Sequence, residues 1–238
     1  MKRSRALKNL INSFSLRILA FAAAVVCVVM GGVQPAYSAR VSFAEGCAYF
    51  AFTIFSFLLS NGYLMSSDRY LYAKRLLIFA LIAEVPFDLL HYGYPVSSHG
   101  QNAIFALLIA LCGMYVCDSV KEVADNSVVS LLTDAAVIAV SILICRTANV
   151  EPSPFAVAIP YVFCISQELS YPRLFQFAGF FALCAIALPG AAPYIAAAVL
   201  LSWLSTGDRG PNALWLRYAF YASYPLMLTA VYLLRTRA

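Results

Sequence analysis

The stretch AKRLLIFALIAEVPFDLL, residues 73–90, decides the fold. Wound as an α-helix, these residues extend about 27 Å, close to the hydrocarbon core of a bilayer at roughly 30 Å. The rest of the chain has the same character: 63% of its 238 residues are hydrophobic, only 11% are charged, and the mean hydropathy is +0.81. Soluble domains carry about 25% charged residues. The sequence therefore predicts an integral membrane protein.

Nine apolar segments of this kind follow one another along the chain, at residues 16–33, 44–64, 73–90, 102–116, 127–144, 155–165, 175–188, 194–204 and 218–234. Backbone exposed to lipid must satisfy its hydrogen bonds internally, and none of the segments alternates as a barrel strand does. We expect an all-α, polytopic transmembrane helix bundle of about 8–10 spans. It forms one integral membrane domain over residues 1–238, with residues 1–15 as a basic cytoplasmic segment. The sixth and eighth segments are short, and nearby prolines make kinked, re-entrant or fused segments an alternative.

The first segment has a second interpretation. Basic residues precede its apolar run, and Ala36-Tyr37-Ser38 follows it, as in a secretory signal peptide. The run is long for a signal core and more spans follow, so we expect the segment to remain as an anchor.

The basic residues predict the orientation of the bundle. If nine spans alternate from a cytoplasmic N-terminus, twelve basic residues face the cytoplasm and four face outward, which obeys the positive-inside rule. The cytoplasmic set is Lys2, Arg3, Arg5, Lys8, Arg17, Arg69, Lys74, Arg75, Lys121, Arg173, Arg209 and Arg217. This asymmetry explains the net charge of +5. The expected partner is therefore the lipid bilayer, and no nucleic acid.

Cysteine and histidine offer no pattern for a metal site. The seven cysteines are scattered singly through apolar runs, without a CxxC pair, and there are two histidines. We interpret the cysteines as small buried hydrophobic residues and expect no metal.

Two acidic residues inside the third segment are the main functional signal. Glu84 and Asp88 are four residues apart and so share one helix face, which His91 continues, while Pro86 removes a backbone hydrogen bond between them. An ionisable group at this depth is costly unless it is paired or faces a cavity. Glu84 is our candidate general base, because desolvation favours the protonated carboxyl and brings proton transfer close to neutral pH. The alternative is that both acids pair with arginines and only hold helices together.

The chain re-enters the predicted bundle at Gln101 and Asn102 after a turn rich in glycine and proline. We expect the amides of these two residues to meet the end of the third segment that carries Asp88 and His91. Asp134 in the fifth segment and Glu168 after the sixth are weaker candidates for partners or substrate contacts.

Several blocks of the sequence resemble the TraX family of bacterial inner-membrane proteins. The resemblance is carried by residues 52–59, Asn61-Gly62-Tyr63, residues 70–88, Gln101-Asn102 with the apolar run after it, residues 207–210, and residues 217–228 with Tyr221, Tyr224 and Pro225. It implies a multi-pass protein of the inner membrane that transfers an acetyl group from acetyl-CoA to an acceptor such as the N-terminus of a pilin.

This chain departs from the family pattern at the residues best able to relay protons. The resemblance leads us to expect an Asp-His pair in the first span, where the chain has Cys27-Val28, and a histidine shortly after Tyr224-Pro225, where it has Met227. Glu151 stands for an acidic residue before the sixth span.

Three functions remain open at this point. In an acyltransferase, the candidate catalytic residues are Glu84 as base, its neighbour Asp88, and Asn102 or Tyr224 as hydrogen-bond donor to the oxyanion. The phosphates of acetyl-CoA would bind a cytoplasmic set made of Arg69, Lys74, Arg75, Arg209 and Arg217. The second function is a non-catalytic scaffold or accessory protein of a pilus or secretion system. The third, a small transporter, fits the buried carboxylates but lacks an internal repeat.

Overall fold

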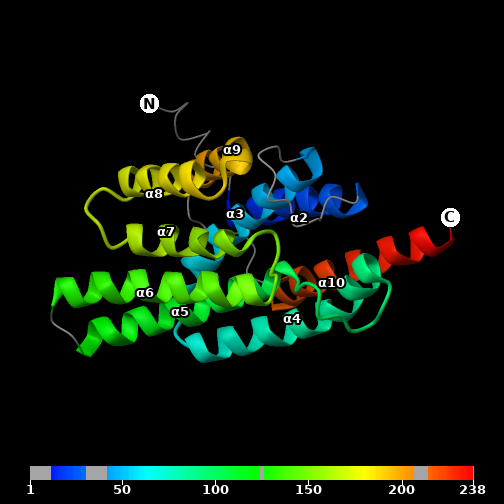
Figure 1. The fold of residues 1–238 in the computed structure, drawn as a ribbon, viewed down its shortest axis with the longest axis horizontal. Coiled ribbons are helices and arrows are strands. Elements are labelled where there is room, and N and C mark those ends of the chain that lie inside the picture. Colours follow the sequence, from blue (N-terminus) through cyan, green and yellow to red (C-terminus); the bar gives the residue numbers. More distant parts are fainter. Residues whose placement is uncertain (1–11, 31–41, 124–125, 206–213, 238) are drawn as a thin grey trace.

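The structure, a computed structural model, describes residues 12–30, 42–123, 126–205 and 214–237 (Figure 1). Within these ranges the chain forms nine α-helices, two short 3₁₀ helices and no strand. They are α2 (Ser13–Val29), α3 (Phe43–Leu64), α4 (Arg69–Tyr92), α5 (Ala103–Val123), α6 (Ser127–Thr147), η1 (Pro154–Val157), α7 (Ala158–Ser166), α8 (Pro172–Ile186), η2 (Pro189–Ala191), α9 (Ala192–Leu204) and α10 (Leu214–Arg237). The prediction of an all-α bundle is confirmed.

Each predicted segment corresponds to one helix, but the boundaries differ. Helix α5 runs seven residues beyond the predicted end at residue 116, because Asp118 and Lys121, which end the apolar run, pair with Arg69 of α4 and Asp134 of α6. Among the described residues, α3, α5 and α6 are each long and apolar enough to cross a membrane. The helices of the short sixth and eighth segments, α7 and α9, each follow directly on a 3₁₀ turn. The number of crossings stays a prediction.

Local signals in the sequence start and stop the helices. Ser42 and Glu45 form a reciprocal capping box at the start of α3, and Asp68 caps α4 by accepting the backbone N–H of Leu71. Helix α4 continues through Pro86 and ends at Gly93, which has a φ of 78°. This left-handed conformation suits a residue without a Cβ. The ends of α4 therefore follow from local chemistry.

Helix α3 is the centre of the bundle and packs against α2, α5, α7 and α9. Its buried face includes Ile54 and Tyr63, which are fully enclosed. Figure 1 shows α8 over α7, with α5 and α6 beneath them and α4 beside α10 at the other edge. Helix α2 packs along α3 and contacts α10, so the first apolar segment is part of the bundle. Residues 36–40, where a signal peptidase would cut under the alternative interpretation, lie outside the described residues.

Contacts near the helix termini identify the two opposite ends of the bundle. At one end, which we call the basic end, Arg69 pairs with Asp118 at 2.8 Å, Lys121 pairs with Glu168 at 2.8 Å, and Arg173 lies in the first turn of α8. At the opposite end the backbone of Gln101 bonds to Asn149 and Glu151. Basic residues assigned to the cytoplasm thus meet at one end of the bundle, as alternating helices require.

The cysteines are only partly as expected. None is in a disulfide among the described residues, and most are buried, but Cys112 is exposed and Cys184 is half-buried. The expectation of uniform burial is wrong because Cys112 lies on a face of α5 that no other described helix covers.

Candidate functional site

A cavity of about 260 Å³ lies between α2, α3, α4, α5 and α10, beside the loop that holds Glu151 and Pro152. Most of its wall is aromatic or aliphatic. Its polar side chains are Arg17, Cys27, Tyr72, Glu151, Tyr221, Ser223 and Tyr224. A mainly apolar cavity with a few convergent polar groups is the usual form of a small-molecule site.

Glu151 is the carboxylate that lines this cavity. Its side chain has neither a hydrogen bond nor an ion pair to a described residue, while its backbone N–H is held by Gln101. Burial, reinforced by the charge of Glu84, raises the pKa of the Glu151 carboxyl to about 8. A carboxyl of this kind can accept or give up a proton near neutral pH. The sequence points to Glu151 only through the family resemblance, because a single Glu in a loop forms no periodic pattern.

Glu84 lies behind the cavity wall rather than in it. Its Oε2 accepts hydrogen bonds from Asn102, at 3.2 Å from the backbone N and 2.5 Å from Nδ2, while its Oε1 is buried and has no hydrogen-bond partner among the described residues. The expectation that the amides of residues 101 and 102 meet Asp88 and His91 is wrong. Asn102 lies one helical turn earlier along α4, and Gln101 pairs with the backbone of the loop before η1.

Asn102 is fully buried and all its side-chain hydrogen-bonding groups are engaged. Its Nδ2 donates to the carbonyl of Ala80 and to Glu84, and its Oδ1 accepts the backbone N–H of Ile104 at the start of α5. No donor of Asn102 therefore remains for an oxyanion. The structure makes it a cap of α5 and a link between α4 and α5.

Asp88 holds a loop. Its Oδ2 accepts the backbone N–H of Ser97 at 2.7 Å, and its Oδ1 is buried without a hydrogen-bond partner in the described part of the chain. His91 bonds through Nδ1 to the carbonyl of Phe87. Neither Glu84 nor Asp88 has an ion pair within the described ranges, so the pairing with arginines considered above is not observed there.

Among the three tyrosines in the first half of α10, two line the cavity and Tyr218 does not. Tyr224 and Tyr221 line it, and Tyr221 stacks on Phe79 with ring centres 4.9 Å apart. Tyr218 is 52% exposed, as expected of a residue at a membrane boundary. Of the four candidate catalytic residues, Tyr224 alone is in the cavity wall.

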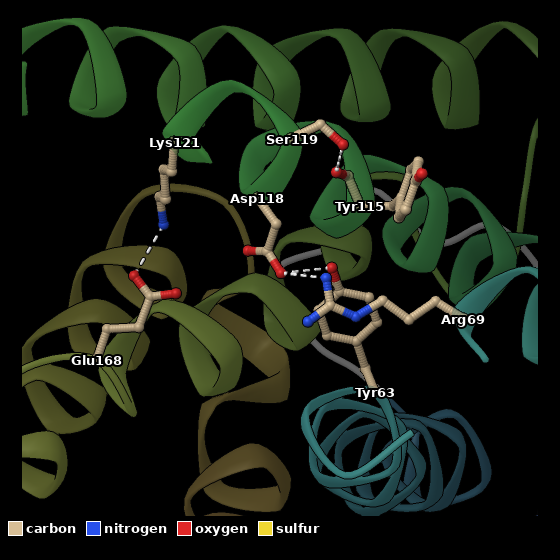
Figure 2. A network of polar contacts seen from close by, with 7 residues as sticks. All are labelled: Tyr63, Arg69, Tyr115, Asp118, Ser119, Lys121 and Glu168. Carbon is tan, nitrogen blue, oxygen red and sulfur yellow. Dashed lines mark hydrogen bonds and ion pairs between the residues drawn. The ribbon is translucent and has the colours of Figure 1, made fainter. Parts of the chain in front are cut away.

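The cations proposed to bind the phosphates of acetyl-CoA do not form one group among the described residues. Figure 2 shows Arg69 directed at Asp118, which also accepts the hydroxyl of Tyr63 at 2.6 Å. Lys74 is exposed, and Arg75 bonds to a carbonyl of its own helix. Arg209 lies outside the described residues, as does the side chain of Arg217. The cation in the cavity wall is instead Arg17.

Asp134 and Glu168 both pair with Lys121, at 3.4 Å and 2.8 Å. Figure 2 shows the Lys121–Glu168 contact at the basic end, beside the Asp118 contacts. These two acids therefore join α5, α6 and the end of α7, away from the cavity. In the part of the chain that the structure describes, no three His, Cys, Asp or Glu residues are grouped to hold a metal ion.

The two places where the resemblance leads us to expect histidines come together in space. Val28 and Met227 belong to one apolar cluster with Phe87, Leu228 and Val231. Tyr224 and Tyr92 pack against it, and Val28 also lines the cavity. In this chain the two positions are therefore occupied by apolar side chains, Val28 and Met227, that belong to the same cluster.

The fold is that of a helical membrane protein with an internal cavity among its first, second, third, fourth and last described helices. The chain belongs to the TraX family: a family model described as TraX protein matches residues 14–235, nearly the whole chain. Comparison with curated proteins and with solved structures gives no match.

Proposed function

We propose that this protein is an integral-membrane acyltransferase of the TraX type, which transfers an acetyl group from acetyl-CoA to an amine or hydroxyl, such as a pilin N-terminus. The location we propose is the bacterial inner membrane, with the N-terminus in the cytoplasm. The gathering of Arg69, Lys121 and Arg173 at one end supports this orientation.

One observation carries the proposal: the cavity joins the segments that resemble the family and presents a carboxyl and a phenol to one space. Glu151 and Tyr224 both line it. Acyl transfer needs a base for the incoming nucleophile and a donor for the oxyanion that develops on the carbonyl.

These two residues then take the roles first considered for Glu84 and Asn102. Glu151 accepts the proton of the attacking amine or hydroxyl, and the Tyr224 hydroxyl donates to the carbonyl oxygen. As the bond to sulfur breaks, the proton passes to the departing thiolate, so that free CoA leaves. Glu84 acts through Glu151, since its negative charge raises the proton affinity of that carboxyl. Asp88 keeps the loop after α4 in place.

The experiment uses the purified full-length protein, acetyl-CoA labelled in the acetyl group, and a panel of acceptors that includes a pilin and simple amines. Glu151→Gln should lower transfer by roughly 10²–10⁴-fold while the melting temperature is retained. Glu122→Gln, a change at an exposed carboxylate of α5, is the matched control and should leave transfer unchanged. Transfer that survives Glu151→Gln in full would remove Glu151 as the base.

A second function is favoured by the apolar cluster around Val28 and Met227. A relative without the family histidines fits a non-catalytic scaffold or accessory protein of a pilus or secretion system. This function predicts no binding of acetyl-CoA and no transfer to any acceptor, together with co-purification of membrane partners.

A further inference from the structure

The cavity is elongated and its two ends differ in charge. Its wall includes residues from Arg17 to Val28 on α2 and from Ala48 to Leu59 on α3. Each range covers eleven steps along a helix, so the cavity extends roughly 16 Å at 1.5 Å per residue. Arg17 lines one end with Leu59 and Tyr72, and Glu151 lines the other.

The positions of both ends follow from contacts. Tyr72 lies in the first turn of α4, close to Arg69 of the basic end. At the far end the hydroxyl of Tyr49 donates to the carbonyl of Pro152 at 3.3 Å, next to Glu151. The cavity therefore runs from the basic end of the bundle toward the opposite end.

Arg17 lines the cavity and, unlike Arg69 and Lys121, has no carboxylate partner among the described residues. Arg69 and Lys121 are neutralised by carboxylates, whereas Arg17 has no ion pair to a described residue and lies over the ring of Phe220 at 5.9 Å. An unneutralised guanidinium in a cavity wall attracts an anion, and its planar group suits phosphate.

Between the two ends the wall holds no charged side chain among the described residues. Phe52, Phe55 and Leu107 line it, and the hydroxyl group of Ser223 is a polar contact. The ligand that this shape favours is a narrow, extended, uncharged chain with an anionic group at the Arg17 end and a polar group at the Glu151 end.

The geometry points to a donor channel: the cavity takes the pantetheine arm of acetyl-CoA from the basic end, with a phosphate at Arg17 and the acetyl thioester at the Glu151 end. This inference rests on the proposed function and adds a direction to it. The donor enters from one face of the bundle, and the acceptor meets the acetyl group near the other, so transfer crosses most of the membrane.

A single-chain fatty acid shares the anionic head and the uncharged chain, and it fits the wall less well. Its methyl end would lie against the Glu151 carboxyl and leave that group without a hydrogen bond, which is costly away from water. The thioester carbonyl of acetyl-CoA can accept a hydrogen bond there.

Equilibrium binding of labelled acetyl-CoA to the full-length protein in nanodiscs tests the channel without requiring transfer. Arg17→Met should weaken binding by about tenfold or more, as expected for a lost charge-assisted contact to phosphate. Arg146→Met, which removes an exposed cation near the opposite end, is its control. For the wild type, CoA should compete for the site, whereas pantetheine, which lacks phosphates, and palmitate should compete poorly.

The middle of the channel is tested on a single helix. Ala24→Phe places a ring into the cavity wall and should abolish binding, while Ala22→Phe adds the same ring to an exposed position two residues away and should not. Melting temperatures of both variants show that each is folded.

Cys27 reports where the acetyl end arrives, because it lines the cavity next to Val28, at the end of the α2 wall opposite Arg17. Bromoacetyl-CoA should alkylate Cys27 faster than bromoacetamide does at the same concentration, and excess CoA should block the reaction. Equal rates for the two reagents would overturn the channel.

Two other results would also overturn the channel. One is acetyl-CoA binding that Ala24→Phe leaves intact. The other is tighter competition by palmitate than by CoA, which would make the cavity a lipid site. The outcome separates the two proposals. Binding through the channel without transfer to any acceptor contradicts the proposed function alone, and transfer unaffected by Ala24→Phe contradicts the channel alone.

Discussion

Replacing Asn102 by alanine distinguishes a structural residue from a catalytic one. Asn102 is fully buried, and its Oδ1 caps α5 through Ile104 while its Nδ2 donates to Glu84. Loss of the cap costs about 1 kcal/mol. Loss of the hydrogen bond to a buried carboxylate costs roughly 1.5–3 kcal/mol more. The backbone N–H of residue 102 still bonds to Glu84, so we expect a total of about 2.5–4 kcal/mol.

Asn126 supplies a matched control. It caps α6 through the same geometry, with its Oδ1 2.9 Å from the backbone N of Val128, but it is exposed and has no carboxylate partner in the described chain. Asn126→Ala should therefore cost only about 1 kcal/mol. The difference between the two variants measures the contact between Asn102 and Glu84.

The assay is reversible unfolding of the full-length protein by SDS in mixed micelles, which gives the free energy of unfolding, with acetyl transfer measured in parallel. If Asn102→Ala loses no more stability than Asn126→Ala, the account of the link between α4 and α5 is wrong. A variant that keeps its stability and loses transfer would instead restore Asn102 as an oxyanion donor.

Of four further predictions, two concern charged side chains and two concern topology. Glu84→Gln removes a negative charge and should lower the pKa of Glu151 from about 8. Because Glu151 must be deprotonated to act as a base, the rising limb of the pH–rate profile should move to lower pH. A midpoint that stays where it is would contradict this. Lys121→Met strands the carboxylates of Asp134 and Glu168 and should cost roughly 1–3 kcal/mol in the same SDS titration, less than a fully buried pair, while Lys121→Arg should cost little. A reporter fused after the last residue should indicate the periplasm if nine spans alternate from a cytoplasmic N-terminus, and a cytoplasmic reporter would remove one span. Mass measurement of the purified protein should find the first helix uncleaved, and a product that begins near residue 39 would show a signal peptide.

The helices could be predicted from the sequence because the signals that make them are local. Apolar runs long enough for a bilayer, the capping box at Ser42 and Glu45, and the glycine that ends α4 all act within a few residues. The shared face of Glu84 and Asp88 is likewise a property of one helix. The family also followed from blocks of sequence, and the match over residues 14–235 confirms it.

What each polar residue contacts was decided only by tertiary structure. Arg69 was assigned to a phosphate site, yet its carboxylate partner, Asp118, lies at the end of the next helix. Glu84 has the pattern of a buried base, yet the carboxyl that lines the cavity is Glu151, which a loop brings back to α2 and α10. Val28 and Met227, near the two ends of the chain, join one apolar cluster. The physical reason is that periodicity determines the face of a helix on which a side chain lies, whereas the neighbour of that face depends on how distant segments pack together.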